Sequence, residues 1–254
     1  MTIAFLCLFV VLIAGGYFVR DLGKLQESIA ARDRQTALQD LTDPAQIDGA
    51  LRQHPSNKFL QLLAMAAKAA NETDAAIEKL TREIEPPAIS KSGNLGGASR
   101  SVLEALRRDL KTAETNATTF LPRYTALLTS ERDNVEKYAR SLSVGPDTIG
   151  KLLDHIDKRH AEIAALTSKM LSARADSYRA SDNYVAFFLA EFGTYKVVNG
   201  QVVFPIQRTV DRYNVAAQAT TLAAKRVAEL EEERKNLKKS QQERWAQFIS
   251  AMRS

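Results

Sequence analysis

The chain has a single cysteine, Cys7, so no disulfide can form within one molecule. Cys7 lies in an uncharged N-terminal stretch, where we expect a buried membrane residue. Glycine and proline are also scarce, with 11 and 7 copies among 254 residues. Because these two residues interrupt helices and strands, their scarcity predicts long uninterrupted elements.

The sequence also lacks the motifs of common catalytic and cofactor sites. It contains no Gly-x-Ser-x-Gly element, and the glycine-rich segment 93–97 follows no strand and precedes no Lys-Ser or Lys-Thr pair. We therefore expect no enzymatic activity, no catalytic residues and no cofactor. The net charge of +5 is spread over 35 basic and 30 acidic residues, so we expect no nucleic-acid partner.

Metal-ligand spacing is missing as well. His155 and His160 are five residues apart, which places them on different faces of a helix. Asp157 and His160 are three apart, but two ligands do not make a metal site. The segment 154–160 is therefore expected to be a solvated helix face without a metal ion.

An apolar run is present at the N-terminus. Residues 2–19 contain no charge over 18 positions, which is close to the minimum length of a bilayer-spanning helix. Tyr17 stands where interfacial aromatic residues are found, and Arg20 ends the run. We interpret residues 1–19 as a transmembrane signal-anchor that contacts membrane lipid. The alternative is a signal peptide cleaved after the small residues 14–16.

The basic residues around this run bear on its orientation. They follow the run and none precedes it, which by the positive-inside rule places the body in the cytoplasm. A start codon further upstream would add a basic segment before the run and reverse this expectation. The basic residues that follow are Arg20, Lys24, Arg32 and Arg34.

The remainder divides into three segments. Residues 20–85 are predicted to form membrane-proximal helices, with separate helices at Asn57–Ala70 and Thr73–Ile84. Residues 86–98, which begin with two prolines and continue with Gly, Ser and Asn, are predicted to be a linker. Residues 99–254 are predicted to form a long helical bundle.

Three long helices are expected in the bundle, starting near Ser101, Asp147 and Gln207. Apolar residues recur at alternating spacings of three and four, which predicts a coiled-coil-like seam. Pro122 lies inside the first helix and predicts a kink or a restart. We expect an all-α protein, with a transmembrane helix followed by a long antiparallel three-helix bundle and one small β-hairpin. The seam predicted in the first helix is Leu103, Leu106, Leu110, Ala113, Ala117, Phe120, Tyr124, Leu127, Asn134, Tyr138 and Leu142.

The hairpin is predicted at residues 194–205. Two short runs rich in β-branched and aromatic residues flank Asn199-Gly200, a pair that supplies the positive φ angles of a type I′ turn. Pro205 ends the second strand because it cannot donate a ladder hydrogen bond.

The hairpin stretch also carries a family resemblance. Val198-Asn199-Gly200, then Phe204-Pro205, then Tyr213-Asn214 resembles the C-terminal signature of the bacterial domain-of-unknown-function family 3053, which includes envelope lipoproteins. The resemblance implies a helical-bundle protein of the bacterial envelope with a periplasm-facing body. This chain lacks the family's lipobox cysteine, and its spacing from Asn-Gly to Phe-Pro is one residue longer. We therefore expect a transmembrane anchor in place of the lipid anchor.

These observations predict a single-pass protein of the bacterial inner membrane that acts as a periplasm-facing structural or interaction protein. One alternative is a cytoplasm-facing coiled-coil adaptor that self-associates or recruits a partner through its long helices. Another is a ligand-binding bundle with a polar pocket near His155 or Tyr178. The candidate partner-docking residues at the hairpin are Tyr195, Val198, Asn199, Gly200, Phe204 and Tyr213.

Overall fold

The computed structural model describes residues 36, 38, 41, 44–84, 95–142 and 144–253. The expected anchor at 1–19 and most of the expected linker at 86–98 lie outside these residues. Within the described residues, no helix is long and apolar enough to span a membrane.

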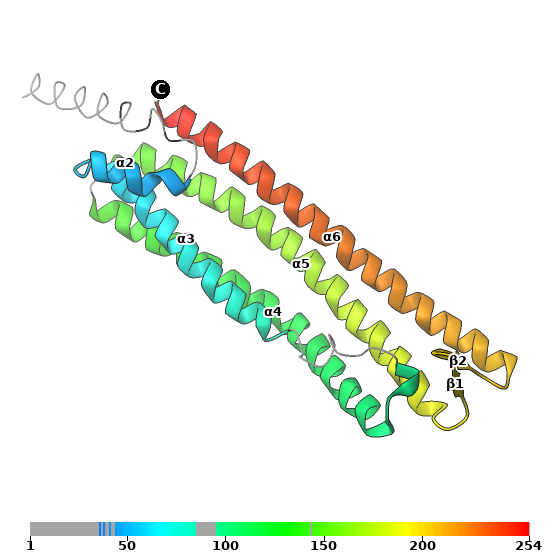
Figure 1. The fold of residues 1–254 in the computed structure, drawn as a ribbon. Helices are drawn as coiled ribbons and strands as arrows, with labels where there is room; N and C mark the ends of the chain where they lie inside the picture. The colour runs from blue at the N-terminus through cyan, green and yellow to red at the C-terminus, as the bar shows by residue number, and fades with distance from the viewer. Residues whose placement is uncertain are drawn as a thin grey trace, which may run out of the picture.

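The described chain is mostly helical, with five α-helices and one two-stranded antiparallel sheet (Figure 1). This confirms the prediction of a mainly helical protein with a small hairpin. The helices are α2 (Ile47–Gln53), α3 (Lys58–Arg82), α4 (Arg100–Ser141), α5 (Pro146–Ala190) and α6 (Gln207–Arg253). The strands are β1 (Lys196–Val198) and β2 (Gln201–Val203), and two 3₁₀ turns are η1 (Pro44–Gln46) and η3 (Leu95–Gly97).

Helix α3 differs from the sequence prediction, which placed two helices in this region. The structure has one continuous helix, and Thr73, the expected first residue of the second helix, is buried inside it. No glycine or proline interrupts the segment, and its buried face continues through Ala69, Thr73 and Leu80. Its N-terminus is capped by Asn57, whose side chain accepts a hydrogen bond of 3.0 Å from the backbone N–H of Leu60.

Helix α4 is continuous through Pro122, so the helix does not restart there. The neighbouring aromatic residues Phe120 and Tyr124 are buried in a cluster shared with α3 and α5. This packing stabilises the helix on both sides of the proline, where one backbone hydrogen bond is missing. At its N-terminus, the Ser99 hydroxyl accepts a hydrogen bond from the backbone N–H of Val102.

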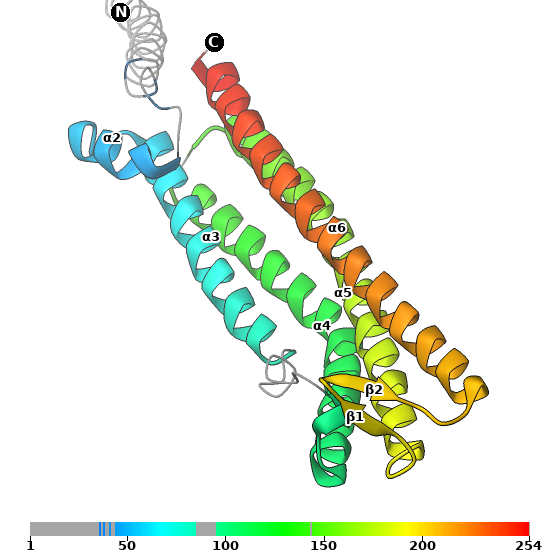
Figure 2. The ribbon, with the colours of Figure 1, turned by 45° about the vertical axis from the view of Figure 1, so that its right-hand side comes forward.

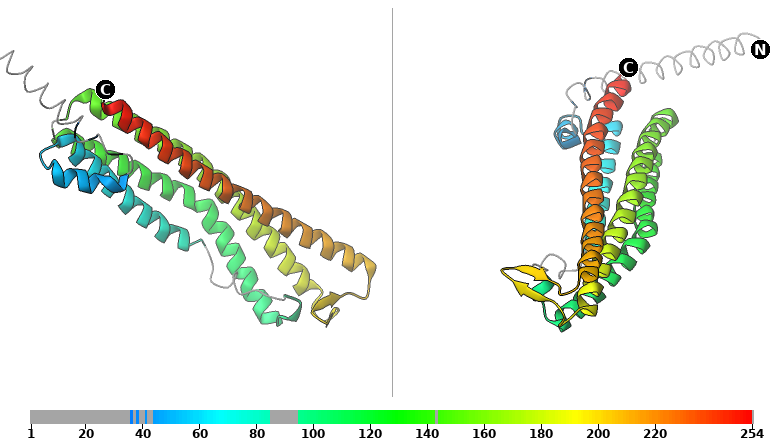
Figure 3. Two further views of the ribbon diagram at one scale, coloured as in Figure 1. Left: turned by 45° about the horizontal axis from the view of Figure 1, so that its top comes forward. Right: turned by 90° about the vertical axis from the view of Figure 1, so that its right-hand side faces the viewer.

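The long helices pack in chain order. Helix α3 lies on α4, α4 on α5 and α5 on α6, whereas α3 and α6 make little backbone contact. Helices α4 and α5 form one side of the molecule, and α3 and α6 lie on the other (Figure 3). Figure 2 shows α3 and α6 standing apart. Among the described residues, four long helices therefore build the bundle instead of the expected three, and none of them covers the side between α3 and α6.

The seam between α4 and α5 follows the predicted residues only as far as Tyr124. Beyond it the buried residues are Leu128, Glu131, Val135 and Ala139 instead of Leu127, Asn134, Tyr138 and Leu142. The next buried residue after Tyr124 is Leu128, four residues on, whereas the predicted one was Leu127, three residues on. All later seam positions are therefore displaced by one residue or more from the predicted ones. This places a glutamate inside the seam.

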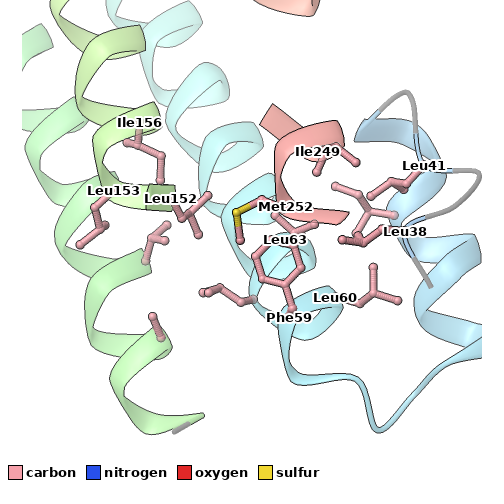
Figure 4. Packing of buried hydrophobic residues seen from close by; sticks show 14 of the residues in the cluster. Leu38, Leu41, Phe59, Leu60, Leu63, Leu152, Leu153, Ile156, Ile249 and Met252 are labelled. Atoms are coloured by element: carbon pink, nitrogen blue, oxygen red, sulfur yellow. The ribbon is translucent and has the colours of Figure 1, made fainter. Parts of the chain in front are cut away.

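The two ends of the bundle are built differently. At one end, α2, α3, α4, α5 and the last turns of α6 converge on an apolar cluster that includes Leu38, Leu41, Phe59, Ile249 and Met252 (Figure 4). Each buried side chain of this size contributes about 1.5–3 kcal/mol relative to an exposed one. The hairpin lies at the opposite end of the bundle from α2 and the C-terminus (Figure 1). We call the hairpin end the distal end.

The hairpin has the predicted register. Val197 pairs with Val202, and the turn residues Asn199 and Gly200 have φ angles of 52° and 79°. These positive values are those that the Asn-Gly pair was expected to supply.

The substitution Gly200→Ala should lower the free energy of unfolding by about 1–2 kcal/mol, because an L-residue is strained at a positive φ. Gly150→Ala is the matched control, since Gly150 lies in α5 and nothing lies within 4 Å of an added Cβ. Gly150→Ala should raise the free energy of unfolding by about 0.5–1 kcal/mol, because alanine favours the helix more than glycine does. Urea unfolding of both variants measures these changes in the free energy of unfolding. Changes in the same direction for both variants would contradict the assigned turn.

Candidate functional site

The open side of the bundle forms a cleft between α3 and α6, with α4 and α5 as its floor. It consists of a wide lobe of about 1090 Å³ and a narrow lobe of about 360 Å³. We call this the α3–α6 cleft. Both lobes are lined by the same five polar residues, which form the waist of the cleft: Asp74, Glu131, Arg159, Lys238 and Gln241.

The wide lobe is open because α3 presents small side chains to it. Ala64, Ala67, Ala70 and Ala75 all line this lobe. Alanine reaches only a methyl group beyond the backbone, so α3 does not fill the space toward α6. The alanine-rich composition of α3 thus favours the helix and also leaves the cleft unfilled.

The floor of the cleft contains a buried pair of polar residues. Glu131 on α4 and His160 on α5 are 4% and 8% exposed, and His160 Nε2 lies 3.1 Å from Glu131 Oε1. Burial by itself raises the pKa of Glu131, but the His160 hydrogen bond and the charges of His160 and Arg159 outweigh it, so the pKa falls below 4.5. Glu131 is therefore ionised at neutral pH.

Two further charges lie above this pair. Arg159 Nη1 is 3.6 Å from Glu131 Oε1. Asp74 on α3 faces them from the side of the cleft, and its residue surface is largely accessible because the cleft is open. Protein atoms nevertheless crowd its carboxyl group, and this desolvation raises the pKa of Asp74 above 3.8 against the opposing charges of Arg159 and Lys238.

The α6 wall of the cleft is a row of hydrogen-bond donors. Lys238, Gln241 and Trp245 are spaced by three and four residues, so they share one face of the helix, and all three line the wide lobe. Gln241 Nε2 and Trp245 Nε1 are buried and have no hydrogen-bond partner among the described residues. Gln241 also lies close enough to Glu162 to favour its ionised form, but without the geometry of a hydrogen bond from Nε2.

His155 closes the base of the wide lobe. Its ring stacks on Phe248 with centroids 4.7 Å apart and lies 6.0 Å from the ring of Trp245. Burial and the charges of Arg159, Arg244 and Lys158 lower the pKa of His155. The prediction of a solvated face for 154–160 is therefore wrong at His155 and His160.

The residues predicted to dock a partner at the hairpin fall into two groups. Tyr195, Phe204 and Tyr213 turn inward and pack on an apolar cluster around Phe188. The hydroxyl of Tyr184 donates to that of Tyr213 at 3.1 Å, which links α5 to α6. These three residues fix the hairpin to the bundle and do not form a free surface.

Val198, Asn199 and Gly200 form the second group and are exposed. Val198 and Val203 lie on the outer face of the hairpin, opposite the inward face of Val202 and Phe204. Each of these two outer valines is 50% exposed. The outer hairpin face is therefore accessible and carries these two valines beside their cross-strand partners Gln201 and Lys196.

Other exposed apolar residues lie at the same end of the bundle. Together with the hairpin valines they form a surface that we call the apolar tip, at the start of α4, the end of α5 and the hairpin. Its members are Val102, Phe192, Val198, Val203 and Ile206, and Val197, which pairs with Val202 on the inward face, is also partly exposed there.

Sequence reasoning missed the waist of the cleft. Glu131 lies on the seam of α4 once the register shift after Tyr124 is taken into account, and His160 lies four residues after Ile156 and three before Ile163 on the seam of α5. A charged or polar residue at a seam position is the signal that could have identified this pair. Nothing in the sequence places Asp74 or Lys238 beside it.

Within the described residues, no three His, Cys, Asp or Glu side chains come together as a metal-binding group. No family model, curated protein or solved structure matches the chain. The family resemblance of the hairpin stretch therefore stays a prediction, and the function has to be inferred from the cleft and the apolar tip.

The pair between Glu131 and His160 predicts a pH-dependent stability. Because the pKa of Glu131 is lowered by folding, its contribution is present above pH 4.5 and is lost as the pH falls through the folded-state pKa. Glu131→Gln should lower the free energy of unfolding at pH 7 by about 2 kcal/mol, since the ionic part of the pair is lost. Its loss of stability below pH 4.5 should be smaller than in the wild type.

Glu104→Gln is the control for this substitution. Glu104 is exposed and pairs with Arg100 one turn earlier in α4, so its change should stay below about 0.5 kcal/mol. Urea unfolding between pH 3 and pH 7 measures both variants. Parallel pH profiles for the wild type and Glu131→Gln would contradict an ionised Glu131 in the folded state.

Proposed function

We propose that this protein is a non-catalytic interaction protein of the bacterial envelope, which presents its apolar tip to a protein partner. One observation carries the proposal: six of the eight exposed large apolar side chains of the described chain lie at the distal end. Exposed apolar residues that cluster in this way mark interaction surfaces, whereas scattered ones do not.

The shape of the bundle supports this role. Helix α6 has 47 residues, which at 1.5 Å per residue is about 70 Å. The tip is thus held far from the end at which α2 and the C-terminus lie (Figure 1). A rod of this length can present its tip to a partner that lies too far from the attachment point for a compact domain to contact.

Ion pairs between neighbouring helices support a stiff rod. Arg107 of α4 pairs with Asp182 of α5 at 2.8 Å, near the distal end. Further along, Arg174 of α5 pairs with Glu231 of α6 at 3.1 Å. Both pairs are partly buried, so each one opposes sliding of the helices past one another.

The attachment point is proposed from the sequence. The uncharged run at 2–19 is the anchor in the inner membrane, and the body faces the periplasm, as the resemblance to family 3053 implies. Chain continuity from residue 19 leads to α2, so this arrangement directs the apolar tip away from the membrane. Membrane lipid contacts the anchor, and the protein partner contacts the tip.

A second candidate is a cytoplasm-facing adaptor that self-associates. The specific observation in its favour is the exposure of Val215 and Leu222 on α6, at 68% and 59%. These residues extend the apolar surface along a long helix, and such a stripe favours pairing with a second copy.

The tip proposal predicts a position-specific crosslink in cells. A photo-crosslinking amino acid in place of Val198 should give a protein adduct, and Val203→Asp in the same chain should reduce the adduct at least fivefold. Gln247, exposed near the other end of α6, is the control position and should give no adduct that depends on Val203. Equal adducts at both positions would overturn docking at the tip, and an adduct of twice 28.1 kDa would favour the self-associating adaptor.

The periplasmic orientation predicts cleavage of the body by protease added to spheroplasts. The exposed basic residues of α6 provide sites for trypsin. A body that stays intact while a periplasmic marker is cut would place it in the cytoplasm.

A further inference from the structure

The α3–α6 cleft contains side-chain donors that form no hydrogen bond with a described residue. Gln241 Nε2 and Trp245 Nε1 are both buried and unpaired among these residues. The large majority of buried donor groups in proteins have a hydrogen-bond partner. A buried donor without one has lost its hydrogen bonds to water and has formed no other in their place. An acceptor from outside the described chain is therefore favoured beside Trp245, whereas Gln241 also lies close to the carboxylate of Glu162.

A third donor stands on the same face of α6. Lys238 lines both lobes of the cleft. No ion pair between described residues includes it, although its charge acts on the carboxyl group of Asp74. Lys238, Gln241 and Trp245 thus form a donor row that runs along the cleft.

Two acids of the waist lie near this donor row. Glu131 is already engaged by His160 and Arg159. Burial raises the pKa of Asp74, while the charges of Arg159 and Lys238 lower it, so Asp74 stays a neighbour of opposite charge to Lys238. An anionic oxygen group is the strongest acceptor for the donors that remain without partners.

The narrow lobe beside the waist has a different character. It is lined mainly by apolar side chains, among them Ile77, Ile84, Phe120, Leu166, Met170 and Leu237. From Phe120 to Glu131 on α4 it extends over 11 residues, or about 16 Å at 1.5 Å per residue. Its volume of about 360 Å³ lies at the lower end of the range for small-molecule sites, which is about 300–1,000 Å³.

We propose that the α3–α6 cleft binds an anionic single-chain amphiphile, whose oxyanion headgroup lies at the waist beside Lys238, Gln241 and Trp245 and whose alkyl chain fills the narrow lobe. A partner helix fits less well, since a helix with its side chains is about 10–12 Å wide. The wide lobe leaves room for a larger headgroup or for water. This site lies apart from the apolar tip, so it does not depend on docking there.

The chain supplies its own reporter for a test. Trp245 is the single tryptophan of the sequence, and it lines the cleft. Full-length protein labelled with 5-fluorotryptophan, in phosphatidylcholine nanodiscs with an unlabelled scaffold, gives one fluorine resonance from this residue. Dodecanoate is the probe, below the concentration at which it forms micelles.

Titration with dodecanoate should move the fluorine resonance to saturation. Dodecyltrimethylammonium, which has an equally long chain and the opposite charge, should give no saturable shift. Hexanoate should bind much more weakly than dodecanoate, because fewer methylene groups enter the narrow lobe. A linear drift with dodecanoate, as expected for partition into the lipid, or a saturable shift with the cationic probe overturns the proposal.

The headgroup position is tested with two neighbouring lysines. Lys238→Met should weaken dodecanoate binding about tenfold, which is the loss expected for one charge-assisted hydrogen bond. Lys239→Met, one residue along α6 and outside the cleft lining, should change it less than twofold. Both side chains are exposed, so neither change should affect folding, which thermal melting checks. Equal binding by the two variants overturns the assignment of the headgroup to the waist.

Discussion

The structure depends on the contact between α4 and α5. Their apolar seam carries the Glu131–His160 pair near the C-terminal part of α4, and this pair joins the two helices in one register. A charged side chain at a seam position is stable only opposite a partner that can bond it, so other registers are disfavoured. Helices α3 and α6 then each pack on one member of the pair, and no helix in the described chain closes the bundle between them.

This arrangement separates two surfaces of different chemistry. The open side gives the α3–α6 cleft, where donors of α6 face an apolar lobe. The hairpin, at one end of the rod, gives the apolar tip. The narrow lobe lies in the middle of the bundle and the tip at its end, so a ligand in the cleft and a protein at the tip would not compete for the same residues.

Local features of the fold were predictable, and features that depend on several helices were not. Asn199-Gly200 sets its turn through its own backbone angles, so the hairpin was correctly predicted. The seam of α4 was right up to Tyr124 and then failed, because several spacings of three or four residues fit the same apolar pattern. Only some of the predicted docking residues are accessible, and the sequence did not show which ones. The pleat of the hairpin and the position of the bundle together decide that Phe204 packs on the bundle and that Val198 faces solvent.

The sequence by itself determined that the protein consists of long helices reversed by one hairpin, because periodic apolar residues and one Asn-Gly pair act through neighbouring residues. It also determined the uncharged run from which the anchor is proposed. Only the tertiary structure decided that α3 joins the bundle, that no described helix covers its side toward α6, that His160 is buried and that His155 is half-buried. The waist brings together residues from four helices, up to 167 positions apart between Asp74 and Gln241, and no local pattern encodes such a meeting.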